Sequence, residues 1–139
     1  MKTGRISPTL VAALISLLTA VMVPLDDSAT ETPVRHLEVP DVTSLEEART
    51  IFFDTTAQLQ SKTRLDAREL NDIHMITYSL EKALAYFVEN SDDKMKATAE
   101  KMAIVIEEVH LGSENNRVEE TRTSLVQYFQ LAQEFSTAL

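Results

Sequence analysis

The amino-acid sequence predicts an all-α protein: an antiparallel up-down-up-down four-helix bundle preceded by a signal segment and an extended leader. Three observations predict this class. Beyond residue 43 the chain has no proline and a single glycine, so long helices can continue without interruption. Apolar residues recur there at alternating spacings of three and four, the repeat of a helix that buries one face. The alternation of apolar and polar residues that is typical of strands is absent from the sequence.

The first element is a signal peptide at residues 1–25. Lys2 and Arg5 precede an uncharged, mostly apolar run from Leu10 to Val23. That order of positive charge, apolar core and polar exit is typical of a secretory signal, and the run is short for a membrane span, which needs about 20 residues. The candidate cleavage positions lack the small-x-small pattern, so an uncleaved anchor is the alternative. We therefore expect a periplasmic or secreted protein.

The second element is an extended leader over residues 26–42. Pro33 and Pro40 stand there among acidic residues, serines and threonines. This composition favours neither helix nor sheet, so we expect an extended segment.

The third element, residues 43–139, holds the four predicted helices. Ser44 and Asp66 each stand three residues before a glutamate, a pattern that caps the start of a helix and here opens the first and second helices. The fourth helix is expected to begin at Ser113, directly after Gly112, which we expect to end the third helix in a left-handed conformation. The predicted buried faces consist of Leu45, Ala48, Phe52, Thr55, Leu59, Leu70, Ile73, Thr77, Leu80, Leu84, Phe87, Met95, Ala99, Met102, Ile106, Val109, Val118, Thr121, Leu125, Tyr128, Ala132 and Phe135.

The predicted connections are short, near residues 62–66, 90–92 and 112–113. Helices joined by a few residues pack against each other in opposite directions. An apolar spacing that averages 3.5 residues keeps one seam facing the neighbouring helices at small crossing angles. These two features predict the up-down-up-down arrangement of the bundle.

The charge balance limits the partners of the chain. It carries 22 acidic and 13 basic residues, and loss of a signal containing Lys2 and Arg5 leaves 22 against 11, a net charge of about −11. Such a charge repels nucleic acid and anionic membrane surfaces. We therefore expect no nucleic-acid partner and, once the signal is cleaved, a protein that is not membrane-integral. A basic protein, or a second copy that meets an exposed apolar seam, is the kind of partner that remains.

No catalytic motif stands out in the sequence. The chain has no cysteine, which excludes thiolate catalysis and thiolate metal sites. It has no Gly-x-Ser-x-Gly, no glycine-rich phosphate loop and no His-Glu-x-x-His. We expect a non-enzymatic binding or accessory protein.

Two of the three histidines are predicted to meet. If the turn between the second and third helices is centred near residue 92, His74 and His110 lie at the same height in the hairpin. Each directly follows a core position, so both are expected at the border between the two helices. Glu107 precedes His110 by three residues and shares its helix face. Imidazole and carboxylate ligands in this arrangement favour a transition metal such as copper or zinc.

A structural pair is the alternative to a metal site. In that case His74 and His110 are hydrogen-bonded within the bundle and bind nothing. In the metal-site interpretation, Thr77 and Tyr78 lie close to the level of His74 and are candidates for hydrogen bonds to the metal-binding side chains. Thr77 also fits a tolerated polar core residue.

Haem is a further alternative. Residues 43–137 are similar in size, topology and compartment to the four-helix-bundle b-type cytochromes, and this similarity is architectural only. In those cytochromes the first helix supplies a methionine and the last helix a histidine to the haem iron. Here the first predicted helix has no methionine and the fourth has no histidine, so the ligands are not matched. Haem held by His74 and His110 would need a different pocket.

Four short stretches resemble a known family. They are Arg35-His36-Leu37-Glu38, Leu45-Glu46-Glu47-Ala48, the stretch from Ile73-His74 through Thr77-Tyr78 to Ala83-Leu84, and Glu108-Val109-His110 with Ser113-Glu114. Together they resemble a family of small exported bacterial helical proteins of unknown function, over residues 34–137. The resemblance implies no activity, but all three histidines, including His36 in the leader, lie inside these stretches.

Overall fold

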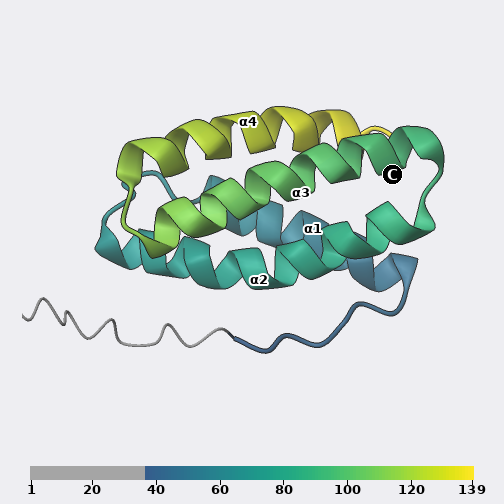
Figure 1. The fold of residues 1–139 in the computed structure, drawn as a ribbon, viewed down its shortest axis with the longest axis horizontal. Helices are drawn as coiled ribbons and strands as arrows, with labels where there is room; N and C mark the ends of the chain where they lie inside the picture. Colours follow the sequence, from purple (N-terminus) through teal and green to yellow (C-terminus); the bar gives the residue numbers. More distant parts are fainter. Residues whose placement is uncertain (1–36) are drawn as a thin grey trace, which may run out of the picture. The chain divides into compact units, whose positions relative to one another are not determined.

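The structure, a computed structural model, describes residues 37–139 (Figure 1). The predicted signal peptide, most of the predicted leader and His36 lie outside these residues. Within them the chain forms four helices and no strand, so the predicted all-α class is confirmed for this part of the chain. The helices are α1 (Leu45–Gln60), α2 (Ala67–Asn90), α3 (Asp93–Glu114) and α4 (Val118–Ser136).

Each helix packs against the next one in the chain, and α1 also contacts α4. Figure 1 shows the four helices lying side by side along the longest axis. The contact between α2 and α3 is the most extensive, and only residues 91–92 separate these two helices. None of the helices in residues 37–139 is both long enough and apolar enough to cross a bilayer.

Side-chain caps begin α1, α2 and α3, and the predicted caps of α1 and α2 are confirmed. The Ser44 hydroxyl accepts a hydrogen bond from the N–H of Glu47 at 3.2 Å. The Asp66 carboxylate accepts one from the N–H of Glu69 at 3.0 Å, and Asp92 caps α3 in the same way. Such caps satisfy N–H groups that have no partner within the helix, so these starts are fixed by local sequence.

The end of α3 differs from the prediction. The helix does not stop at Gly112, which has no left-handed conformation, and it continues to Glu114. Asn116, with φ of 54°, takes the left-handed position, which asparagine tolerates better than most residues. Ser113 is therefore a buried residue of α3 and not the N-cap of α4. That cap position is Arg117, whose side chain makes no capping hydrogen bond.

Gly112 is instead a position of close packing between α3 and α4. A Cβ atom added there would lie 2.7 Å from Oγ1 of Thr121, closer than nonbonded atoms approach. The two helices approach this closely because residue 112 has no side chain.

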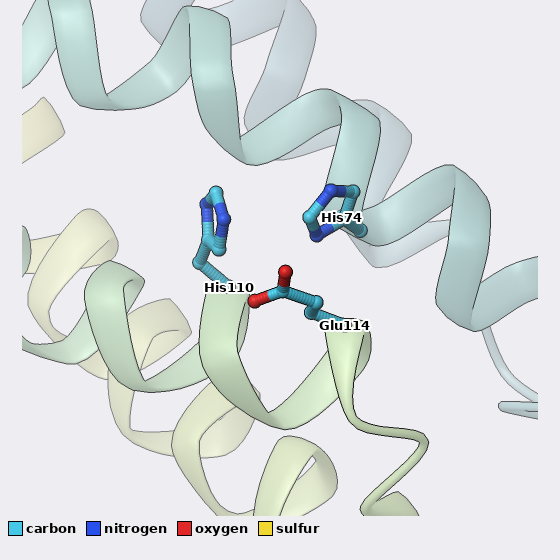
Figure 2. Close-up of side chains that lie close together, drawn as sticks. All are labelled: His74, His110 and Glu114. Atoms are coloured by element: carbon cyan, nitrogen blue, oxygen red, sulfur yellow. The ribbon is translucent and has the colours of Figure 1, made fainter. Parts of the chain in front are cut away.

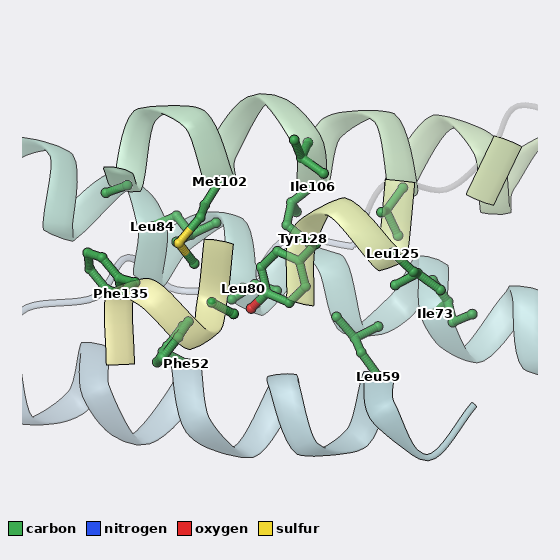
Figure 3. Close-up of a cluster of buried hydrophobic side chains, with 14 of the residues drawn as sticks. Phe52, Leu59, Ile73, Leu80, Leu84, Met102, Ile106, Leu125, Tyr128 and Phe135 are labelled. Carbon is green, nitrogen blue, oxygen red and sulfur yellow. The ribbon is translucent and has the colours of Figure 1, made fainter. Parts of the chain in front are cut away.

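The buried core contains most of the predicted stripe residues, and Figure 3 shows a part of it. Met95 and Val118, near the starts of α3 and α4, are only half-buried. Leu45 is 48% exposed, so the prediction that it is buried is wrong. It lies one turn before Ala48, the first buried residue of α1, on a surface that it shares with Arg49.

The described end of the leader lies against α2. Asp41 forms an ion pair with Lys82 of α2 at 2.5 Å. Val42 packs against the hydrophobic core. These contacts bring the leader to the part of α2 that carries the candidate site.

Candidate metal centre

The candidate site begins with two buried imidazoles on the hairpin of α2 and α3. His74 of α2 and His110 of α3 are 7% and 6% exposed. Their ring centroids are 4.6 Å apart and the ring planes meet at 65°. The short turn between the helices sets their register, so residues expected at one height are in contact. The structure thus brings together the two histidines that the sequence singles out.

A carboxylate joins the imidazoles, and it belongs to Glu114. Three potential ligand atoms lie within 4.8 Å of one another, one each from His74, His110 and Glu114 (Figure 2). Glu114 is half-buried in the last turn of α3. It follows His110 by four residues, so both side chains project from the same helix face. Figure 2 shows the carboxylate reaching toward the gap between the two rings.

Glu107, the carboxylate that the sequence favours as a ligand, is exposed and lies outside this group. Its role as a metal ligand stays a prediction. Sequence reasoning missed Glu114 because the third helix was expected to end at Gly112. Two more helical residues create the pair of His110 and Glu114 on one face, and that spacing is the signal that could have found it.

The surroundings of Nδ1 fix the protonation of the His110 ring. Oγ1 of Thr77 lies 3.0 Å from this nitrogen, and Oε1 of Glu81 lies 2.9 Å from it. The Thr77 hydroxyl donates its own proton to the carbonyl of His74 at 2.7 Å, so its oxygen is an acceptor toward His110. We therefore assign the proton of the neutral imidazole to Nδ1, which places the lone pair on Nε2.

Glu81 is a second residue that sequence reasoning missed. It follows His74 by seven residues, two turns along the same face of α2, and this spacing is the signal for it. Burial raises the pKa of the Glu81 carboxyl, and the neighbouring His110 opposes that shift through its charge and hydrogen bond. The charge of Glu107 raises the pKa of Glu81 further. A carboxylate behind a histidine is a common arrangement in metal sites.

Tyr78 contacts the His74 ring, as Glu81 contacts the His110 ring. Its hydroxyl is 3.2 Å from Nε2 of His74, and the two rings meet edge to face with centroids 5.1 Å apart. Burial raises the pKa of the phenol, so it keeps its proton at neutral pH. A hydrogen bond from the backbone of Leu37 lowers this pKa in part, and the charge of Glu114 raises it. Tyr78 and Thr77 thus both contact the imidazoles.

The donor set suits a divalent first-row transition metal. Two imidazoles and a carboxylate are ligands of zinc and copper sites, and they leave one tetrahedral position open. Ligand atoms around one such ion are about 3.3 Å apart when the bonds are about 2.0 Å long. The three atoms already lie within 4.8 Å, so side-chain adjustments can close the set. Haem fits less well, because axial imidazoles face each other across a porphyrin and these rings are in edge contact.

The described part of the chain is all-helical and carries a histidine–carboxylate cluster whose two imidazoles are buried. The model of DUF6746, a family of unknown function, matches residues 1–137, and the chain belongs to this family. No curated protein and no solved structure matches the chain. The resemblance to an uncharacterised family is confirmed, while export and the likeness to b-type cytochromes stay predictions.

Proposed function

We propose that this protein is a small, exported, non-enzymatic binding protein that holds one divalent transition metal, copper or zinc, at His74, His110 and Glu114. The observation that carries the proposal is the convergence of three ligand atoms within 4.8 Å. The scaffold is an antiparallel up-down-up-down bundle. Short connections and packing between consecutive helices support that arrangement.

The charges around the site support a divalent ion. The carboxylates of Glu114 and Glu81 would together balance its two positive charges, which a buried ion requires. Imidazole and carboxylate donors suit Cu²⁺ and Zn²⁺. Cu⁺ prefers sulfur ligands, but the chain has no cysteine and Met75, next to His74 in the sequence, is 39% exposed.

Export is supported by the charge and apolar pattern of residues 1–25, a stretch that the family model also covers. The proposed location is the periplasm or the outside of the cell. A basic protein or a second copy remains the kind of partner that the acidic composition favours.

A structural histidine pair with no ligand is the second candidate, and one observation favours it. Nδ1 of His110 already has hydrogen-bond partners in Thr77 and Glu81. These contacts would hold the ring in place without any metal.

Equilibrium binding separates the two candidates. The protein, expressed with its own N-terminal segment and stripped by a chelator, is titrated with Zn²⁺ and Cu²⁺ in a calorimeter. We expect about one ion per chain and loss of binding in His74→Ala and His110→Ala. A wild type that binds neither ion, or variants that bind as tightly as the wild type, would overturn the proposal.

Two further measurements identify the ligands. Glu114→Gln is expected to weaken binding more than Glu107→Gln, and the reverse order would restore Glu107 as the carboxylate ligand. Nitrogen couplings in the Cu²⁺ EPR spectrum count the bound imidazoles, and two are expected. A third would point to His36, the remaining histidine of the chain, which lies outside the described residues.

A further inference from the structure

We infer that Glu81 is a positioning residue of the metal site: its carboxylate holds the Nδ1 proton of His110 and thereby directs the Nε2 lone pair to the metal. This inference rests on the proposed metal-binding function. Glu81 does not belong to the group of ligand atoms formed by His74, His110 and Glu114. Its effect on the metal would therefore pass through His110.

The contacts of the Glu81 carboxylate point to a role at His110. Oε1 lies 2.9 Å from Nδ1 of His110, a hydrogen bond to the neutral ring, and within residues 37–139 Glu81 lies within ion-pair distance of no other basic side chain. The adjacent Lys82 pairs with Asp41 of the leader instead. The carboxylate is thus committed to the imidazole and not to a network of surface charges.

The need for a carboxylate follows from the chemistry of imidazole. A neutral ring has one N–H and one lone pair, and only the nitrogen with the lone pair binds a metal. The Thr77 hydroxyl accepts from Nδ1 only while it donates to the carbonyl of His74, so on its own it holds the Nδ1 proton less firmly than a group that can only accept. A carboxylate only accepts, so Glu81 holds the proton on Nδ1 and also fixes the orientation of the ring.

The test compares two glutamates of α2. Glu81→Gln and Glu81→Leu are matched by Glu89→Gln and Glu89→Leu, which remove the same charge from an exposed position two turns further along the helix. Zn²⁺ affinity is measured by competition with a chromophoric chelator. We expect Glu81→Leu to bind about 10- to 100-fold more weakly than the wild type. The Zn²⁺ affinity of Glu81→Gln should lie between those of Glu81→Leu and the wild type, because its amide oxygen still accepts the Nδ1 proton. The Glu89 variants should bind Zn²⁺ as tightly as the wild type.

A spectroscopic measurement separates positioning from a general loss of structure. The ¹⁵N chemical shifts of the His110 ring in the metal-free protein report which nitrogen carries the proton. We expect protonated Nδ1 in the wild type and a mixture of tautomers in Glu81→Leu, with helical content unchanged. A wild type that binds zinc while the Glu81 variants behave like the Glu89 variants overturns this inference alone. A wild type that binds no zinc overturns the proposed function, and the metal role of Glu81 with it.

Discussion

Two clusters of aromatic rings lie in the bundle, and they share a geometry but differ in chemistry. The phenylalanine cluster is Phe52, Phe87 and Phe135, and the histidine cluster is His74, Tyr78 and His110. Rings of the first meet edge to face with centroids 5.0 to 6.3 Å apart. Rings of the second meet in the same way at 4.6 to 5.1 Å. The two clusters therefore share a ring geometry, and they differ in the polarity of their rings.

The two clusters differ in what the burial of their rings contributes to the free energy of folding. Burial of hydrocarbon rings stabilises the fold through the area removed from water and through favourable edge contacts. Burial of imidazoles beside carboxylates costs free energy unless every polar group is hydrogen-bonded. We therefore expect the phenylalanine cluster to contribute most to stability, and the histidine cluster to contribute less unless it holds the proposed metal.

The phenylalanine cluster should carry the larger share of stability. Phe52→Ala removes a ring that is 1% exposed and leaves a cavity between α1, α2 and α4. We expect the free energy of unfolding to fall by about 3 to 5 kcal/mol, measured by urea denaturation followed by circular dichroism. Phe52→Leu should lose less because it fills part of the cavity. A loss below about 1 kcal/mol in the alanine variant would contradict this expectation.

The histidine cluster should contribute stability mainly when metal is bound. Zinc at about 100 times its dissociation constant should raise the free energy of unfolding by about 2.7 kcal/mol. The double variant His74→Leu/His110→Leu should show no such gain. In chelator its free energy of unfolding should differ from the wild type by at most about 2 kcal/mol, since lost hydrogen bonds are offset by apolar burial. A larger loss in chelator would mean that the histidines serve stability after all.

Gly112 tests how tightly the helices pack beside the histidine cluster. Gly112→Ala places a Cβ atom 2.7 Å from Oγ1 of Thr121. We expect a loss of about 1 to 3 kcal/mol from the strain, although alanine alone favours a helix by about 0.5 to 1 kcal/mol. Thr121→Ala removes the obstructing oxygen, so the double variant should recover most of the loss in a double-mutant cycle. Additive effects would show that the two residues do not meet.

Features of the fold and the site could be predicted from the sequence where the signal is local. They could not where a residue distant in the chain determines the structure. The caps at Ser44 and Asp66 depend on three neighbouring residues, so they could be predicted. Gly112 stands where a helix often ends, but its packing against Thr121 of α4 makes it a helix-interior residue. Because the third helix was expected to end at Gly112, Glu114 in its last turn was not considered as a ligand. Glu81 was missed because its partner, His110, is on another helix, and the seven-residue spacing from His74 is the one signal for it within α2.

The smallest expected effect concerns a charge at the α1–α2 connection, outside both clusters. The Glu69 carboxylate accepts hydrogen bonds from the N–H groups of Leu65 at 2.9 Å and Arg64 at 2.8 Å. These bonds hold Leu65 at its unusual φ of 52°. They lower the pKa of Glu69 below its ordinary value of 4.5, and the bond from Leu65 contributes most.

The sign of the pH dependence of stability follows from this lowered pKa. The unfolded chain binds the proton of Glu69 more tightly than the folded chain, so the contribution to stability is present above the ordinary pKa and is lost as the pH falls through the folded value. Glu69→Gln should therefore lower the melting temperature at pH 7 more than at acid pH. Glu46→Gln, which removes an exposed acid from the first turn of α1, should lower it less at pH 7. If the deficit of Glu69→Gln is the same at both pH values, the charge of Glu69 does not stabilise this connection.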